Sequence, residues 1–318
     1  MVILEVNNQE ERKYLEGVAT EAQLGTRTYS CAYVQPTSKG NGLNVKTVNL
    51  TYVTSSMIAS TLTTCGIADA NVIAMTPLSG GVSGTGALTG IMKAFEDATG
   101  KPLDETKKEI ASEELVITGD LGEDIGQDKA TGVINDIKTE IIKNNTQDTI
   151  QIADTINNIT NNYNVTLTPQ QQQHLESLMT KVAEQNYDYK EMKDALNSVK
   201  DVVNKKLNEI GEKVPTSLIG SIKEWFTGIG DWFSDLFNSS DKDLGILETT
   251  NDDLLGDNAI VDATDKDAIK LPTTEDAKGF FNKICNWFTS LFNNDSDTNA
   301  PENNENSTEQ VDSPVIQN

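Results

Sequence analysis

The pattern of apolar and polar positions changes along the 318-residue chain. Residues 1–103 alternate short strand signals with helix signals, which is typical of an α+β domain. Residues 104–212 instead repeat apolar positions at a spacing of three or four, which predicts a helical array. We therefore expect an α+β fold in which an N-terminal domain of strands and helices is followed by an α-helical region.

An antiparallel hairpin is expected early in the first domain. Its strands are Arg27–Gln35 and Leu43–Val53, and Asn41-Gly42 between them is a pair that tolerates the positive φ of a tight turn. Val2–Val6 also has the pattern of a strand. That strand begins with no lead-in, so we expect that Met1 is not the native start and that the domain is truncated at its N-terminus.

A helix, a strand and a second helix should follow the hairpin. The helix is expected at Ser55–Thr64 and the strand at Asn71–Thr76, after which the glycine-rich loop Gly80–Gly86 leads into a helix at about 87–98. Such a loop can present backbone amides to a phosphate or carboxylate, but this one lacks the Lys-Ser/Thr ending of a P-loop. A tight passage from strand to helix is favoured, and the alternative is a hydrolase that uses carboxylates near the loop.

The clearest helix signals lie in residues 104–212. Thr168, Pro169 and Gln171 form a helix start, because threonine can cap, proline fits the first turn and glutamine can close a capping box. Apolar residues recur at helical spacing on both sides of this start: Val133, Ile134, Ile137, Ile141, Ile152, Ile156, Ile159, Tyr163, Leu175, Leu178, Met179, Val182, Met192, Leu196, Val199, Val203, Leu207 and Ile210. These stripes need partners, so the helices should pack on one another.

An internal repeat lies beyond the helical array. It predicts two aromatic amphipathic helices, at 216–238 and 277–293, joined by an acidic linker at 239–276. Exposed apolar faces of this kind usually mark interaction sites. The two apolar faces are expected to pack against the core of the protein itself, against a membrane surface or against a protein partner. The candidate interaction residues are the aromatic side chains of the two faces: Trp225, Phe226, Trp232, Phe233, Phe237, Phe280, Phe281, Trp287, Phe288 and Phe292.

Charge and composition exclude several functions. The chain has 49 acidic and 25 basic side chains, a formal charge of −24 that excludes nucleic-acid binding through a basic face. Residues 294–318 are expected to be a disordered acidic tail. The single histidine, His174, is expected on an exposed helix surface, and one histidine excludes the commonest zinc sites. No catalytic constellation is recognisable, so we predict no metal and no cofactor, and the pattern leans against an enzyme.

Several motifs together resemble a known family. They are Glu10–Glu16, Gly40–Val45, Val82–Ile91 and Asn164–Thr168, and through them residues 1–210 resemble the YpuA-like family, extracytoplasmic proteins of Gram-positive bacteria with a domain of unknown function. The resemblance implies a signal peptide and a further stretch ahead of the N-terminal strand. It implies no activity and no catalytic residues.

The resulting hypothesis is a non-enzymatic binding protein, secreted or in the cell envelope, that attaches through its aromatic helices. If Met1 is the true start, the protein is instead cytoplasmic, since its first residues are not a signal peptide. An oxidising compartment permits a disulfide between Cys31 and Cys65, and the alternative is two thiols in a reduced protein. Cys285, on the second aromatic helix, is expected to be a buried or free thiol.

Overall fold

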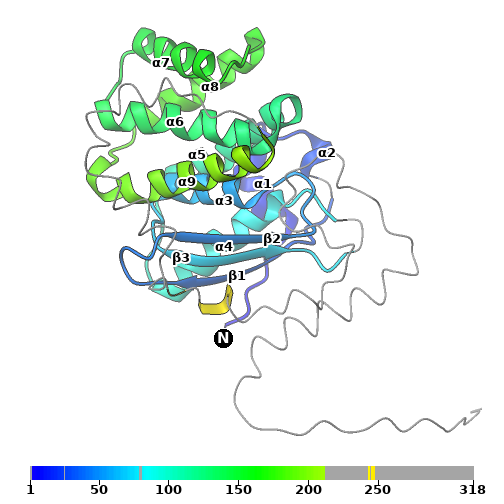
Figure 1. The fold of residues 1–318 in the computed structure, drawn as a ribbon. Coiled ribbons are helices and arrows are strands. Elements are labelled where there is room, and N and C mark those ends of the chain that lie inside the picture. The colour runs from blue at the N-terminus through cyan, green and yellow to red at the C-terminus, as the bar shows by residue number, and fades with distance from the viewer. Residues whose placement is uncertain (1, 25, 79–80, 212–242, 244, 248–318) are drawn as a thin grey trace, which may run out of the picture.

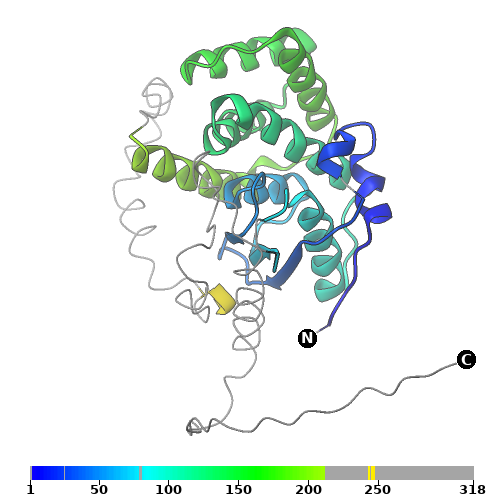
Figure 2. The same cartoon turned by 90° about the vertical axis from the view of Figure 1, so that its right-hand side faces the viewer.

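The structure is a computed structural model that describes residues 2–24, 26–78, 81–211, 243 and 245–247. Figures 1 and 2 show a small sheet at one end of the molecule and helices stacked from it towards the other end, where α7 and α8 lie. The helices are α1 (Asn8–Leu15), α2 (Glu21–Leu24), α3 (Ser55–Thr64), α4 (Thr85–Thr99), α5 (Glu105–Ile125), α6 (Gln127–Asn144), α7 (Thr149–Asn162), α8 (Pro169–Ala183), α9 (Tyr189–Glu209) and the short 3₁₀ helix η2 (Gly245–Leu247). This confirms the expected α+β fold.

The sheet has three strands in the order β1-β3-β2. They are β1 (Cys31–Pro36), β2 (Leu43–Val48) and β3 (Ala70–Met75), and β3 pairs antiparallel with β1 and parallel with β2. The predicted hairpin is therefore wrong, because β3 lies between its two strands. All six residues of β3 are buried, and the central position is the one in which a strand that is apolar on both faces is best covered.

The predicted strand at Val2–Val6 is also wrong. These residues have no regular secondary structure. The segment lies against α4 instead, where Lys93 Nζ donates a hydrogen bond to the carbonyl oxygen of Glu5 at 2.7 Å.

The helix predictions from local signals are largely confirmed. The α3 helix spans the predicted Ser55–Thr64, and α8 begins with the predicted capping box, in which Thr168 N–H donates to Gln171 Oε1 and Gln171 N–H donates to Thr168 Oγ1. The last apolar stripe ends earlier than predicted. Leu207 is buried but Ile210 is 60% exposed, because α9 ends at Glu209 and Ile210 only caps it.

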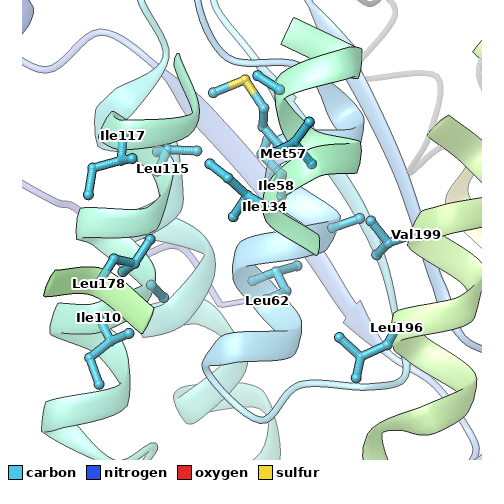
Figure 3. Close-up of a cluster of buried hydrophobic side chains, with 14 of the residues drawn as sticks. Met57, Ile58, Leu62, Ile110, Leu115, Ile117, Ile134, Leu178, Leu196 and Val199 are labelled. Carbon is cyan, nitrogen blue, oxygen red and sulfur yellow. The ribbon is translucent and has the colours of Figure 1, made fainter. Parts of the chain in front are cut away.

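One hydrophobic cluster joins the sheet to the helices of the described residues. Its members range from Leu43 on β2 to Leu207 on α9, and thus include both the strand-containing and the helical part of the sequence. Figure 3 shows its centre, where side chains from five helices meet: Met57, Ile58, Leu62, Ile110, Leu115, Ile117, Ile134, Leu178, Leu196 and Val199. The α5 helix, for which the sequence pattern predicts no individual stripe, contributes to this centre.

The C-terminal predictions fall mostly outside the described residues. This holds for both aromatic helices, for the tail at 294–318 and for the linker at 239–276 apart from Asp243 and η2. Among the helices that the structure does describe, none has both the length and the hydropathy to cross a membrane.

Candidate functional site

The N-terminus of α4 is occupied by a carboxylate from α1. Glu11 is only 2% exposed, and its carboxylate accepts hydrogen bonds from Thr85 Oγ1 at 2.8 Å and Thr28 Oγ1 at 2.6 Å. Gly84, which caps α4, has no side chain to offer to this helix end. The charge of Glu11 lies where the helix dipole favours an anion. A carboxylate of the chain itself thus lies beside Thr85, the first residue of α4.

Two glycines at the start of α4, Gly84 and Gly86, are explained by close packing. Gly84 has a φ of +91°, and a Cβ at this position would lie 2.9 Å from a methyl group of Leu50. A Cβ on Gly86 would lie 3.0 Å from Glu11 Oε2. Both positions need glycine for conformation or space, which favours a tight passage from strand to helix. The carboxylate at this loop is buried and bonded to two hydroxyls, so the geometry does not favour the alternative hydrolase.

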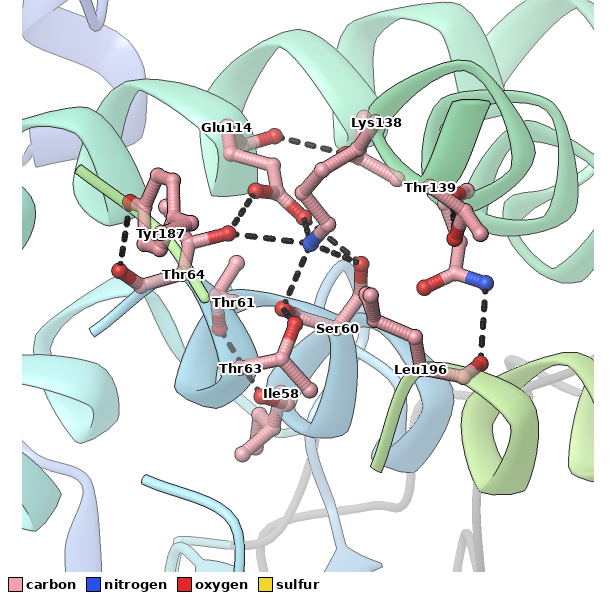
Figure 4. Close-up of polar contacts among 12 residues, drawn as sticks. Ile58, Ser60, Thr61, Thr63, Thr64, Glu114, Lys138, Thr139, Tyr187 and Leu196 are labelled. Atoms are coloured by element: carbon pink, nitrogen blue, oxygen red, sulfur yellow. Dashed lines mark hydrogen bonds and ion pairs between the residues drawn. The ribbon is translucent and has the colours of Figure 1, made fainter. Parts of the chain in front are cut away.

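A second polar cluster lies within the core between α3, α5 and α6, as Figure 4 shows. We call Ser60, Thr64, Glu114 and Lys138 the Lys138 network. Lys138 Nζ donates to Glu114 Oε1 at 2.8 Å, to the carbonyl oxygen of Ser60 at 2.8 Å and to Thr64 Oγ1 at 2.9 Å. The hydroxyls of Ser60 and Thr64 each donate to one carboxylate oxygen of Glu114. Each hydroxyl therefore accepts from the ammonium group and donates to the carboxylate.

Burial decides what the Lys138 network can do. Glu114 and Lys138 are 0% exposed and Ser60 is 1% exposed. Burial lowers the pKa of Lys138 below its usual value, and the charge of Glu114 opposes this shift. A serine 3.1 Å from such a lysine resembles a nucleophile with its base, but Ser60 cannot contact a substrate unless the core opens. The network is therefore structural.

A third polar cluster crosses the sheet, where three amide side chains stand in register. Asn71 of β3 is paired with Gln35 of β1 and Asn44 of β2. Asn44 Nδ2 donates to Asn71 Oδ1 at 2.9 Å, and Asn71 Nδ2 donates to Gln35 Oε1 at 3.2 Å. Asn71 is 0% exposed, so these neighbours fix the orientation of its amide. We call Gln35, Asn44 and Asn71, together with the nearby Asn41, the amide row.

The amide row holds the backbone of a segment that is far away in the sequence. Asn41 pairs twice with Asp243, because its Nδ2 donates to the Asp243 carbonyl oxygen and its Oδ1 accepts from the Asp243 N–H, both at 3.0 Å. Asn71 Nδ2 donates to the same carbonyl oxygen at 3.0 Å. The adjoining η2 contacts β3 and lies beside the sheet, as Figure 1 shows in yellow. Three hydrogen bonds thus recognise main-chain atoms and none of them depends on the side chain of Asp243.

The loop that carries Asn41 is held in place by Asp69. Asp69 Oδ1 accepts hydrogen bonds from the N–H groups of Gly40 at 2.8 Å and Gly42 at 2.9 Å. Both glycines have positive φ values, whereas Asn41 of the predicted Asn41-Gly42 turn does not. Asn41 itself is half-buried between them. The loop therefore presents the Asn41 amide on a fixed support.

The other predicted site residues are not brought together. Cys31 lies exposed on β1 and Cys65 is buried at the end of α3, and the candidate disulfide between them is not formed in this structure. Cys65 Sγ instead contacts Met92 Sδ at 3.3 Å, and burial raises its pKa. His174 is exposed on α8. The aromatic candidates, from Trp225 to Phe292, lie outside the described residues.

The described part of the chain is thus an α+β protein with a closed Lys138 network in its core and an amide row that hydrogen-bonds the main chain of Asp243. Residues 1–199 match a family described as "Protein of unknown function (DUF1002)". The chain belongs to this family. It is 37% identical over 201 residues to the uncharacterised protein YpuA of Bacillus subtilis (strain 168), and the match covers 63% of this chain and 69% of that protein. No solved structure matches the chain.

Proposed function

We propose that this protein is a non-enzymatic binding protein and that its amide row takes a short peptide segment as ligand. The observation that carries the proposal is the pairing of Asn41 and Asn71 with the main chain of Asp243. Recognition through main-chain hydrogen bonds is one of the recurring modes by which proteins bind peptides. The amide row lies within the residues that match the family, and Asp243 lies outside them.

The proposal places the protein outside the cytoplasm, secreted or in the cell envelope. It is supported by the resemblance of the motifs at Glu10–Glu16 and Val82–Ile91 to extracytoplasmic YpuA-like proteins. Fractionation of the bacterium that encodes the protein tests this location. We expect the protein in the medium or the wall and membrane fractions, and recovery in the cytoplasm alone would contradict the proposal.

Attachment is proposed to occur through the aromatic segments at 216–238 and 277–293. The full-length chain should sediment with vesicles of phosphatidylcholine and phosphatidylglycerol if the partner is a membrane surface. Replacing Trp225, Phe226, Trp287 and Phe288 together by alanine should abolish this. If the wild-type chain stays in the supernatant at every lipid composition, a protein partner remains as the proposed attachment.

Peptide binding is tested in a full-length variant in which the chain's own Asp243 no longer pairs with the amide row. We call it the vacated variant. The variant Asp243→Pro with Gly245→Val removes the N–H that donates to Asn41 and places a side chain where Gln35 leaves no space. We expect a fluorescent peptide with the sequence of residues 240–250 to bind this variant in an anisotropy titration.

Asn41 provides the specificity control. Adding Asn41→Ala to the vacated variant should abolish peptide binding, because it removes two of the three main-chain hydrogen bonds. Adding Asn158→Ala, a change at an exposed asparagine on α7, should leave it intact. No saturable binding to the vacated variant, or binding that is insensitive to Asn41→Ala, would contradict the proposed function.

A further inference from the structure

The geometry around Gly245 points to a selectivity and to a means of control for the amide row, and this inference rests on the proposed function. We propose that the site selects peptides with a glycine two residues after the residue that pairs with Asn41, and that Asp243 and Gly245–Leu247 of the chain itself occupy it as a resident competitor. A partner peptide of the same chemistry must therefore displace this segment before it binds.

The glycine selectivity follows from backbone conformation and from space. Gly245 has a φ of +47°, in the left-handed region that residues with a Cβ avoid. A Cβ at this position would lie 2.3 Å from Gln35 Oε1 and 3.0 Å from Gln35 Nε2. Gln35 cannot move away without cost, because its Oε1 accepts the hydrogen bond from Asn71 that orders the amide row. Any other L-residue therefore meets both an unfavourable φ and an occupied volume.

The chain's own segment competes with free peptides because it is covalently connected to the site that it occupies. Asp243 belongs to the same chain as Asn41, so its segment acts at an effective local concentration and not at the bulk concentration of a free peptide. Three hydrogen bonds join the main chain of Asp243 to the side chains of Asn41 and Asn71, and Asp243 itself is exposed. A free peptide can therefore approach the position at which these three hydrogen bonds form.

The test compares two full-length chains and three peptides by fluorescence anisotropy. The chains are the wild type and the vacated variant Asp243→Pro with Gly245→Val. The peptides have the sequence of residues 240–250 with glycine, L-alanine or D-alanine at the position of Gly245. The vacated variant should bind the glycine peptide at least about tenfold more tightly than the wild type does, because the wild type carries its own ligand.

The peptide series tests the selectivity. The L-alanine peptide should bind the vacated variant about tenfold more weakly than the glycine peptide, because L-residues disfavour positive φ. The D-alanine peptide should bind more tightly than the L-alanine peptide, since a D-residue accepts that φ.

Two results would overturn the inference while leaving the proposed function standing. The first is Asn41-dependent binding of the glycine peptide with the same affinity in both chains, which would show that the segment does not compete. The second is equal affinity of the glycine and L-alanine peptides for the vacated variant, which would remove the selectivity. Absence of any Asn41-dependent binding would instead contradict the proposed function itself.

Discussion

The Lys138 network and the amide row are both dense in polar groups, and they differ in where the partners come from. In the Lys138 network, every partner is a core residue of α3, α5 or α6, and Ser60 is the most exposed at 1%. In the amide row, Asn41 is partly exposed and its partner is Asp243, beyond the family-matching region. The hydrogen bonds of the Lys138 network are made among its own four residues, whereas the amide row is completed by a residue from outside the family-matching region.

This difference teaches that hydrogen bonding alone does not identify a functional site. Buried polar groups are nearly always paired, so a satisfied network inside a core is the expected state of such groups. The informative feature is a set of donors and acceptors that is held in a fixed orientation and meets a ligand at the surface. Asn71 is held by Asn44 and Gln35, and it still has a donor available for Asp243.

The largest expected effect is the loss of stability when the Lys138 network is broken. Lys138→Met leaves the Glu114 carboxylate buried without its cation, and removing one member of a buried ion pair costs about 3–5 kcal/mol. Urea denaturation followed by circular dichroism should show a free energy of unfolding lower by that amount. A loss below about 1 kcal/mol would show that the network is not structural.

A double variant separates the charge effect from a loss of packing. Glu114→Leu together with Lys138→Met removes both charges and should be more stable than Lys138→Met alone. The hydroxyls of Ser60 and Thr64 can then donate to helix carbonyl oxygens, as Thr61 already does to Ile58 in α3. If the double variant is less stable than the single one, the loss comes from packing.

Glu11 lies between the two cases, because it is buried like Glu114 but bonds to Thr28 in a partly exposed loop as well as to the buried Thr85 of α4. Glu11→Ala should lower the free energy of unfolding by about 1–3 kcal/mol, since it leaves the hydroxyls of Thr28 and Thr85 without their acceptor. Thermal unfolding by calorimetry measures this. Glu11→Gln retains an acceptor oxygen and should cost less. Equal losses in both variants would show that the charge at α4 matters more than the hydrogen bonds.

Much of the fold could be predicted from local sequence signals. The bounds of α3, the capping box of α8 and most apolar stripes of the helical region depend on spacing within one segment, and these were confirmed. Strand pairing depends on competition between segments, and there the prediction was wrong. The Asn41-Gly42 turn suggested a hairpin, but β3 is the most buried strand and takes the place between β1 and β2.

The amide row could not be recognised from the sequence for the same reason. Gln35, Asn44 and Asn71 lie on three different strands, and only the observed register makes them neighbours. A polar residue within a buried strand, as Asn71 is in β3, was the one available signal. The pairing of Asn41 with Asp243 joins residues about 200 positions apart, which no local pattern encodes.

Glu105 is an exposed carboxylate that pairs with lysine, as the buried Glu114 does. Comparing the two shows how burial changes the contribution of such a pair to stability. It accepts from Lys108 Nζ at 2.6 Å and Lys13 Nζ at 2.8 Å, but its side chain is 56% exposed. Hydrogen bonds from Lys108 and Lys13 lower the pKa of Glu105 to about 2, from an ordinary value of 4.5. A carboxylate with a lowered pKa stabilises the fold above its unfolded pKa, and this contribution is lost as the pH falls from 4.5 towards 2.

The effect of Glu105 on stability should therefore be small and dependent on pH. Glu105→Gln should lower the free energy of unfolding by only about 0.5 kcal/mol at pH 7, because exposed ion pairs are screened by water. The difference from the wild type should shrink below pH 4.5 and vanish near pH 2. Urea titrations at several pH values measure it. If Glu105→Gln lowered the free energy of unfolding at pH 7 as much as Lys138→Met does, burial would not explain the difference between the two ion pairs.

The smallest expected effect is that of Asn41→Ala on the stability of the full-length chain. The described contacts of its side chain are the two hydrogen bonds to Asp243, and these lie at the exposed end of the amide row. Surface substitutions of this kind change the free energy of unfolding by no more than about 0.5 kcal/mol. The same substitution should abolish peptide binding by the vacated variant. Urea denaturation of Asn41→Ala beside Asn158→Ala measures the first effect, and a loss above about 1 kcal/mol in Asn41→Ala alone would mean that the amide row supports the fold in the way the Lys138 network does.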